Sequence, residues 1–208
     1  MNANRNVERG QATRAHIIDV AMRLFAVHGY DGTSIEAVLA ESGVSRGSLY
    51  HHFASKDVLF LAVLEAVSAQ ITEQAAVAMQ EARNPVDVLR IGGMQWLRQA
   101  RDPVVRQVML IDAPAVLGWR RWREMDEQST LGVIRSAIAY AADAGAVDQR
   151  HVDVFAHIVL AAANEIAMMI ALASDSAAAA DEAESALADF LDRLLSAPGS
   201  RSQGSGPG

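Results

Sequence analysis

The sequence has no cysteine, a single lysine, and few aromatic residues, which make up 5% of its 208 positions. Without cysteine, the chain cannot form disulfide bonds, zinc sites built from thiolates, or a cysteine nucleophile. The N-terminal residues MNANRNVERGQ are polar and lack the apolar run of a secretory signal, so we expect a cytoplasmic protein. The most apolar window, 152–173, contains two carboxylates, a histidine and an asparagine, which indicates a buried or interfacial helix rather than a membrane span.

Charge is distributed unevenly along the chain. The formal net charge is −7, yet residues 1–60 hold six basic and six acidic side chains, together with four of the six histidines. The rest of the chain therefore carries the whole negative excess. A neutral N-terminal segment permits contact with a polyanion such as nucleic acid, whereas the acidic remainder disfavours it.

Apolar residues recur with helical spacing through most of the chain, and no sustained alternation of period two is present. We predict an all-α fold of about nine helices, with an N-terminal three-helix helix-turn-helix domain and a larger C-terminal helical domain. The expected helices cover 11–28, 34–41, 46–52, 55–83, 85–100, 103–111, 115–143, 149–173 and 177–196.

Local signals define the first three helices. Gly29 is expected to stop the first helix as a left-handed cap. Thr33 and Glu36 match a capping box at the start of the second helix. Ser42-Gly43-Val44 breaks that helix, and Ser45 is a good N-cap for the third. Two short helices joined by a glycine-containing turn indicate a helix-turn-helix arrangement.

The third helix, within GVSRGSLYHHF (43–53), contains a glycine where a helix favours alanine. Leu49 and Phe53 share one helical face and are expected to hold the helix down. The opposite face and its flank bring together Arg46, Gly47, Ser48, Tyr50 and His51. A glycine there would let the backbone approach a second surface closely, and the neighbouring side chains suit phosphates and base edges. The pattern predicts a DNA-contacting face.

Residues 13–64, TRAHIIDVAMRLFAVHGYDGTSIEAVLAESGVSRGSLYHHFASKDVLFLAVL, resemble the DNA-binding region of the TetR family of transcriptional regulators. The resemblance implies phosphate contacts from Thr33, Ser34, Tyr50, His51 and Lys56, and a major-groove surface of Arg46, Gly47 and Ser48, with Ser45 beside it. The only lysine, Lys56, begins the fourth helix, where free backbone N–H groups also attract a phosphate.

The same resemblance implies a repressor that binds a palindromic operator as a homodimer and is released by a small-molecule effector, with no cofactor or metal. The expected domains are a flexible N-terminal arm (1–12), the DNA-binding domain (13–56), an effector-binding and dimerisation domain (57–196) and a disordered tail (197–208). The sequence identifies neither operator nor effector, and activation is an alternative to repression.

The last two helices have apolar faces broader than one protomer can bury, which predicts a four-helix dimer interface. An intramolecular helical hairpin is the alternative. The predicted interface residues are Phe155, Ile158, Val159, Ala162, Ile166, Met169, Leu187, Phe190, Leu191 and Leu194.

An effector pocket is expected among the middle helices, because such pockets combine apolar walls with a few fixed polar groups. Methionine and tryptophan at helical spacing also fit an ordinary core. Asn164 and Glu165 interrupt an apolar run and need partners if buried. The candidate ligand-binding residues are Met94, Trp96, Met109, Asp112, Trp119, Trp122, Tyr140, Asn164, Glu165 and Met168.

Two other classes of function fit an all-helical chain. An enzyme would use His151, Asp153, His157 and Glu165, but the two histidines are six residues apart rather than the four expected of a helical metal site. The other class is a structural helical dimer without operator binding.

Overall fold

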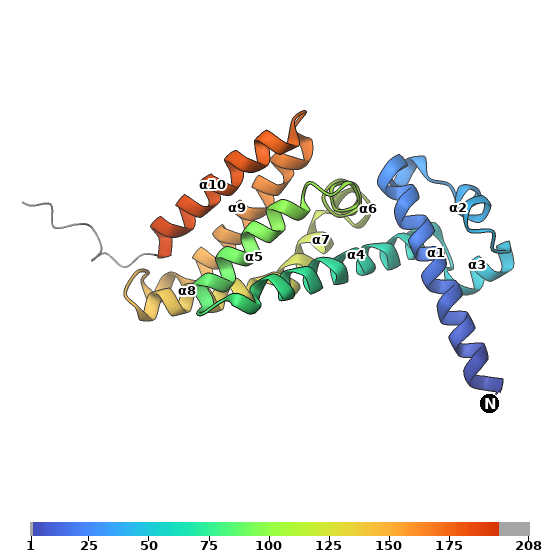
Figure 1. Cartoon of the computed structure of the whole chain (residues 1–208), viewed down its shortest axis with the longest axis horizontal. Helices are drawn as coiled ribbons and strands as arrows, with labels where there is room; N and C mark the ends of the chain where they lie inside the picture. The colour runs from blue at the N-terminus through green and yellow to red at the C-terminus, as the bar shows by residue number, and fades with distance from the viewer. Residues whose placement is uncertain (1, 196–208) are drawn as a thin grey trace, which may run out of the picture. The chain divides into compact units, whose positions relative to one another are not determined.

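The computed structural model describes residues 2–195 (Figure 1). This part of the chain is entirely helical, as predicted, and forms nine continuous helical stretches, four of which change helix type along their length. The α-helices are α1 (Asn2–Gly32), α2 (Ile35–Ser42), α3 (Arg46–His52), α4 (Lys56–Ala78), α5 (Pro85–Gln99), α6 (Ala113–Leu117), α7 (Trp119–Asp126), α8 (Gly132–Asp143), α9 (Val152–Leu172) and α10 (Ser176–Leu195). Two π-helices, η2 (Val105–Asp112) and η3 (Glu127–Leu131), and two 3₁₀ turns, η1 (Met79–Glu81) and η4 (Gln149–His151), adjoin them. The expected tail, 197–208, lies outside the described residues.

The chain packs into two compact units. The first contains the residues up to Glu73 together with Gln99–Trp122, and the second contains Gln74–Arg98 together with the residues from Arg123 onward. These units do not divide at residues 56 and 57, where the sequence places the end of the DNA-binding domain. That boundary stays a prediction about function.

An aromatic cluster forms the centre of the first unit. The rings of Phe25 and Phe60 meet edge to face with centroids 5.3 Å apart, and Tyr30 packs on Phe60 at 5.1 Å. Helix α1 also packs against α2, α3 and η2. Because α1 contacts all three, it is the scaffold on which the short helices are arranged.

In the second unit, α9 lies between α8 and α10 in contact with both (Figure 1). Ile138, Ile170 and Leu187 are buried there. A Cβ on Gly93 would lie 3.4 Å from a Leu187 methyl group, so glycine lets α5 approach α10 closely. An ion pair from Arg98 to Glu184, 3.1 Å long, links the same two helices.

Two helical stretches, Lys56–Glu81 and Gln149–Leu172, are long and apolar enough to span a bilayer by length and composition alone. One third of the most apolar window in each is buried inside the protein. The second stretch contains α9, whose packing against two neighbours agrees with the predicted buried or interfacial helix.

Helix α1 begins earlier than predicted and breaks at the predicted residue. It starts at Asn2, and the non-helical backbone of Gly29 kinks it, with a short helical piece continuing to Gly32. Gly29 has φ 68° and ψ 174°, a backbone conformation outside the left-handed helical region. The predicted αL cap is therefore wrong, although the need for glycine at this position is real.

The predicted break at Ala113-Pro114 is also wrong. The helical stretch continues through Pro114 to Leu117, and the break comes at Gly118, where φ is 79°. Pro114 directly follows the π-helix η2, at whose end the Ala113 N–H donates to the Val108 carbonyl. A proline cannot make an ordinary i→i−4 bond, and the wider π-helical turn before it tolerates that loss.

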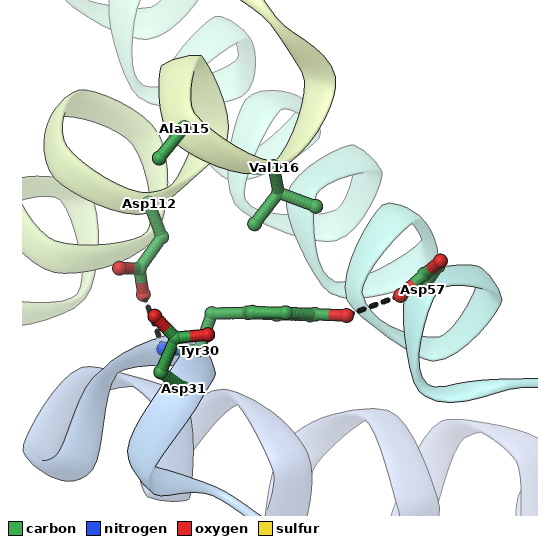
Figure 2. A pocket seen from close by; sticks show the side chains of 6 residues that line it. All are labelled: Tyr30, Asp31, Asp57, Asp112, Ala115 and Val116. Carbon is green, nitrogen blue, oxygen red and sulfur yellow. Dashed lines mark hydrogen bonds between the residues drawn. The ribbon is translucent and has the colours of Figure 1, made fainter.

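Tyr30 connects three segments of the first unit (Figure 2). Its backbone N–H donates to Asp112 Oδ2 over 2.7 Å, which ties the end of α1 to η2. Its hydroxyl donates to Asp57 in the first turn of α4. Gln107 donates a second hydrogen bond to Asp112 over 3.0 Å, so the buried carboxylate is satisfied on both oxygens.

Replacing Gly29 with alanine should destabilise the fold by about 1–3 kcal/mol, because alanine disfavours this backbone conformation. Its Cβ would also lie 3.2 Å from Gln107 Nε2. Thermal and urea unfolding measure the change. Gly132→Ala is the matched control, since Gly132 is helical with open space at its Cβ. Equal stability of the two variants would contradict the role assigned to Gly29.

Burial of the phenol, followed by its hydrogen bond to Asp57, raises the pKa of Tyr30 from 10.0 to about 12. The neutral phenol thus stabilises the folded state fully below pH 10, and this contribution is lost as pH rises through about 12. In a UV titration we expect one phenol component near pH 12 that Tyr30→Phe removes and Tyr140→Phe retains. Survival of that component in Tyr30→Phe would refute the assignment.

Candidate nucleic-acid interface

Helices α2 and α3 are joined by a short turn whose geometry is set by three residues. Ser34 Oγ accepts from the Ala37 N–H at the start of α2, and Ser45 Oγ accepts from the Ser48 N–H at the start of α3. Gly43 adopts the left-handed conformation, φ 66° and ψ 8°, at the end of α2. Hydroxyl caps and a glycine turn hold two short helices in a helix-turn-helix.

The predicted capping box is wrong by one residue. Ser34, not Thr33, caps α2, and Glu36 pairs with Arg46 instead of reaching back to the cap. Thr33 is 2% exposed, and its hydroxyl donates to the Gly29 carbonyl over 2.8 Å. Its hydroxyl proton is thus committed inside the protein, and we withdraw Thr33 as a phosphate contact.

The inner face of α3 is anchored as predicted. Leu49 and Phe53 are both buried. The guanidinium of Arg14, from α1, lies 5.3 Å from the centre of the Phe53 ring. Also from α1, His16 Nε2 lies 3.1 Å from the Ser42 carbonyl oxygen at the end of α2, within hydrogen-bonding distance. The orientation of the recognition helix therefore depends on α1.

The outer face of α3 is available to a partner. Arg46, Gly47, Tyr50 and His51 are exposed, and Ser48 is half-buried. A Cβ built on Gly47 would meet no atom within 4 Å. Because Gly47 has neither a positive φ nor a crowded Cβ, nothing inside the described residues requires glycine at this helical position.

Arg46 and Glu36 link the two short helices. Arg46 Nη2 donates to Glu36 Oε1 over 2.9 Å, and both side chains are exposed. The hydrogen bond from Arg46 holds the pKa of Glu36 below its usual value, and Glu36 in turn raises the pKa of Arg46. The pair places a guanidinium at the edge of the outer face of α3.

Lys56 stands at the start of α4, beside the Tyr30 ring. Its Nζ lies 4.0 Å from the ring centroid, a cation–π contact. Ser55 caps the helix by accepting from the Val58 N–H over 3.2 Å. The predicted phosphate contact of Lys56 remains a prediction, and Tyr30, which sequence reasoning passed over, is the side chain that holds it.

A pocket of about 300 Å³ opens next to Tyr30 (Figure 2). Burial raises the pKa of Asp112 there, against the opposing effect of the hydrogen bonds from Tyr30 and Gln107. No group of three histidine, aspartate or glutamate side chains among the described residues is arranged to hold a metal ion. The lining residues are Tyr30, Asp31, Asp57, Asp112, Ala115 and Val116.

The predicted effector residues do not form one site. Met109, Asp112, Trp119 and Trp122 belong to the first unit, and only Asp112 lines the pocket there. Trp122 is a core residue, since its Nε1–H donates to the Met109 carbonyl over 3.2 Å, and Trp119 is exposed beside it. In the second unit Met94, Trp96, Asn164 and Met168 are half-buried, while Tyr140 and Glu165 are exposed.

One expectation about that second group is met. Asn164 has a partner in Asp126, whose carboxylate accepts from Asn164 Nδ2 over 2.5 Å. Burial raises the pKa of Asp126, and the bond from Asn164 opposes the shift. The Nε1–H of Trp96 is buried with no hydrogen-bond partner among the described residues. The sequence offered no signal for Asp126, which follows an arginine-rich surface segment.

The predicted dimer residues divide into three groups by exposure. Val159, Leu187 and Leu191 are buried within the protomer, so they fill its own core and present no surface to a partner. Phe155, Ala162, Ile166 and Leu194 are half-buried. Ile158, Met169 and Phe190 are exposed.

Exposed apolar residues nevertheless form a stripe along α9, which the exposed Glu165 interrupts. Val154, Ile158, Met169 and Leu172 are each between 46% and 65% exposed. Their separations of 4, 11 and 3 residues keep them on one helical face. This face of α9 is therefore a candidate interaction surface.

The residues proposed for an enzyme have other partners. Asp153 pairs with Arg135 over 2.6 Å, and His157 Nδ1 lies 3.7 Å from Glu127. Glu165 is exposed. The His151 ring packs against Phe155. None of these contacts connects the four residues to one another.

Comparison with known proteins agrees with the helix-turn-helix geometry. Residues 17–63 match the family described as bacterial regulatory proteins, tetR family, and residues 86–194 match the tetracyclin repressor-like C-terminal domain. A TetR-family regulator from Pectobacterium atrosepticum is 27% identical, with a TM-score of 0.74 over 92% of this chain and 98% of its own. One from Chloroflexus aurantiacus is 25% identical, with a TM-score of 0.72 over 89% and 97%.

Curated relatives match over about a third of this chain. The transcriptional regulator AcrR of Shigella flexneri is 39% identical over 71 residues, 34% of this chain and 33% of AcrR. The transcriptional repressor AcnR of Corynebacterium efficiens is 39% identical over 61 residues, 29% and 32% of the two chains. The matched segment thus spans about a third of each relative. These matches and the domain-length match over 86–194 exclude the enzyme alternative, and the chain belongs to the TetR family of soluble, DNA-binding transcriptional regulators.

Proposed function

We propose that the protein is a cytoplasmic repressor that binds a palindromic operator as a homodimer and leaves it when a small-molecule effector binds. Relatives that share its DNA-binding segment are named repressors, which supports the direction of regulation. The DNA-contacting residues are then Ser34, Ser45, Arg46, Gly47, Ser48, Tyr50, His51 and Lys56.

One observation carries the DNA-binding proposal, namely the empty space over Gly47. A glycine in a helix costs up to about 1 kcal/mol relative to alanine, and Gly47 is the second residue of α3. Neither backbone conformation nor internal packing offsets that cost at Gly47. Close approach of an external surface does offset it, because without a Cβ the backbone of α3 can enter the major groove more deeply.

The exposed stripe on α9 supports the homodimer. One protomer presents one recognition helix, and a palindromic site needs two, separated by about 34 Å, one turn of DNA. A two-fold interface through Val154, Ile158, Met169 and Leu172 would bury the stripe against the same stripe of a second copy. Phe190, exposed on α10, adds apolar surface to that face.

The second unit is the proposed effector-binding part. It contains a half-buried aspartate, Asp126, held by Asn164, and an indole N–H of Trp96 without a partner among residues 2–195. Helix α4 begins in the first unit and ends in the second. An effector that shifts α4 would change the separation of the two recognition helices and weaken operator binding, and DNA would weaken effector binding by the same factor.

Selection of duplexes from a random DNA pool by the purified protein tests the proposal. We expect enrichment of an inverted repeat, with an affinity that falls as salt rises, with a log–log slope of about −0.9 per phosphate neutralised. Failure of the folded dimer to enrich any sequence would favour the structural-dimer alternative.

Gly47→Leu should abolish binding to the selected duplex, lowering affinity at least about a hundredfold, because a bulky side chain keeps α3 out of the groove. Helix content measured by circular dichroism should not change. Gly132→Leu, at another helical glycine with open space around it, is the control and should bind normally. Normal operator binding by Gly47→Leu would mean that the outer face of α3 has been assigned wrongly.

Met169→Glu should dissociate the homodimer, because it places two carboxylates in an apolar interface. We expect the dimer dissociation constant, measured by sedimentation equilibrium, to rise at least about tenfold. Val133→Glu, on an exposed valine of α8, is the matched control and should remain dimeric. A wild-type protein that sediments as a monomer at every concentration would refute the dimer.

A further inference from the structure

The ion pair between Arg46 and Glu36 has no evident role in holding the fold. Both helices are capped by serine hydroxyls, and α3 is anchored by its buried inner face. The two side chains of the pair are 58% and 67% exposed. Exposed pairs of this kind contribute little to folding stability, because solvent screens the attraction and two flexible side chains are ordered.

Glu36 also works against the function of the surface on which it lies. It is an exposed carboxylate in the first turn of α2, next to the guanidinium at the start of α3. A carboxylate at a DNA-contacting face repels phosphates and lowers affinity for every sequence. A residue that costs general affinity and adds little stability has another effect to offset that cost.

The geometry of the pair indicates that effect. Only Nη2 of Arg46 is engaged by Glu36, over 2.9 Å. A guanidinium has five N–H donors in a rigid planar fork, so Glu36 leaves the other donors available to a further partner. A carboxylate fixed at one corner of the fork sets the direction in which the others point. Glu36, and to a smaller extent Tyr50 one turn further along α3, raise the pKa of Arg46.

We propose that Glu36 is a specificity-determining residue, which orients Arg46 so that its free donors reach the O6 and N7 acceptors of one guanine in each half-site. Guanine is the base whose major-groove edge accepts two hydrogen bonds from a guanidinium. Without Glu36, Arg46 samples several directions and contacts neighbouring bases or phosphates. The inference rests on the proposed function. It adds that Glu36, the ion-pair partner of Arg46, sets the base preference.

The test compares duplexes selected from one random pool by the wild type, Glu36→Gln, Arg46→Ala and the double variant. Glu41→Gln is the matched control, since Glu41 is exposed in the same helix and has no ion pair among residues 2–195. Both glutamine variants remove one negative charge near DNA, so both should bind somewhat tighter. Affinities are then measured on the wild-type duplex and on duplexes with each base pair of the half-site replaced.

At one position of each half-site, we expect the wild type and Glu41→Gln to prefer G·C equally. In Glu36→Gln that preference should fall by roughly fivefold, in line with the small energy of an exposed ion pair. Arg46→Ala should lose the preference, and adding Glu36→Gln to Arg46→Ala should change it no further, because the effect of Glu36 acts through Arg46.

Equal base preferences for Glu36→Gln and Glu41→Gln would overturn the inference and leave the proposed function intact. A G·C preference that survives Arg46→Ala would do the same. If the wild type enriches no duplex at all, the proposed operator binding fails, and the role of Glu36 fails with it. Because both side chains are exposed, we expect every variant to fold. Circular dichroism checks this.

Discussion

The hydrogen bond from the Tyr30 backbone N–H to Asp112 is the contact on which the DNA-binding end depends. Helix α1 is interrupted at Gly29, and the interruption directs the Tyr30 N–H at a buried carboxylate. A buried carboxylate and a buried backbone N–H are both costly when they lack a hydrogen-bond partner. Here each is the partner of the other. The bond joins residues 82 positions apart and fixes the end of α1 against η2.

From that fixed point the rest of the first unit follows. The Tyr30 ring packs on Phe60 and lies under Lys56, so the start of α4 is held beside the end of α1. A helix of seven residues, such as α3, has little stability of its own. Its orientation comes from Leu49 and the contacts of α1, and its outer face is therefore free to carry residues such as Gly47 that weaken a helix.

Sequence reasoning succeeded where structure depends on neighbouring residues and failed where it depends on distant ones. The caps and turn of α2 and α3 were predicted to within one residue; the error at Thr33 arose because two adjacent hydroxyls both fit the cap. The partnership of Tyr30 with Asp112 has no local signal. Helical spacing identified the apolar faces of α9 and α10 but could not tell which side of a broad face is core, so buried Leu187 and exposed Met169 were predicted alike.

Three cations of the DNA-binding end are already engaged within the chain. Arg46 pairs with Glu36, and Lys56 and Arg14 each lie over an aromatic ring. Because residues 1–60 hold as many acidic as basic side chains, attraction to any duplex is weak, and DNA must exchange partners with these groups. Breaking an exposed contact within the protein costs little free energy. Only the matching base edge, however, replaces the hydrogen bonds that are lost. On such a surface, the choice between DNA sequences therefore depends on how well the base edges replace these hydrogen bonds, and not on the net charge.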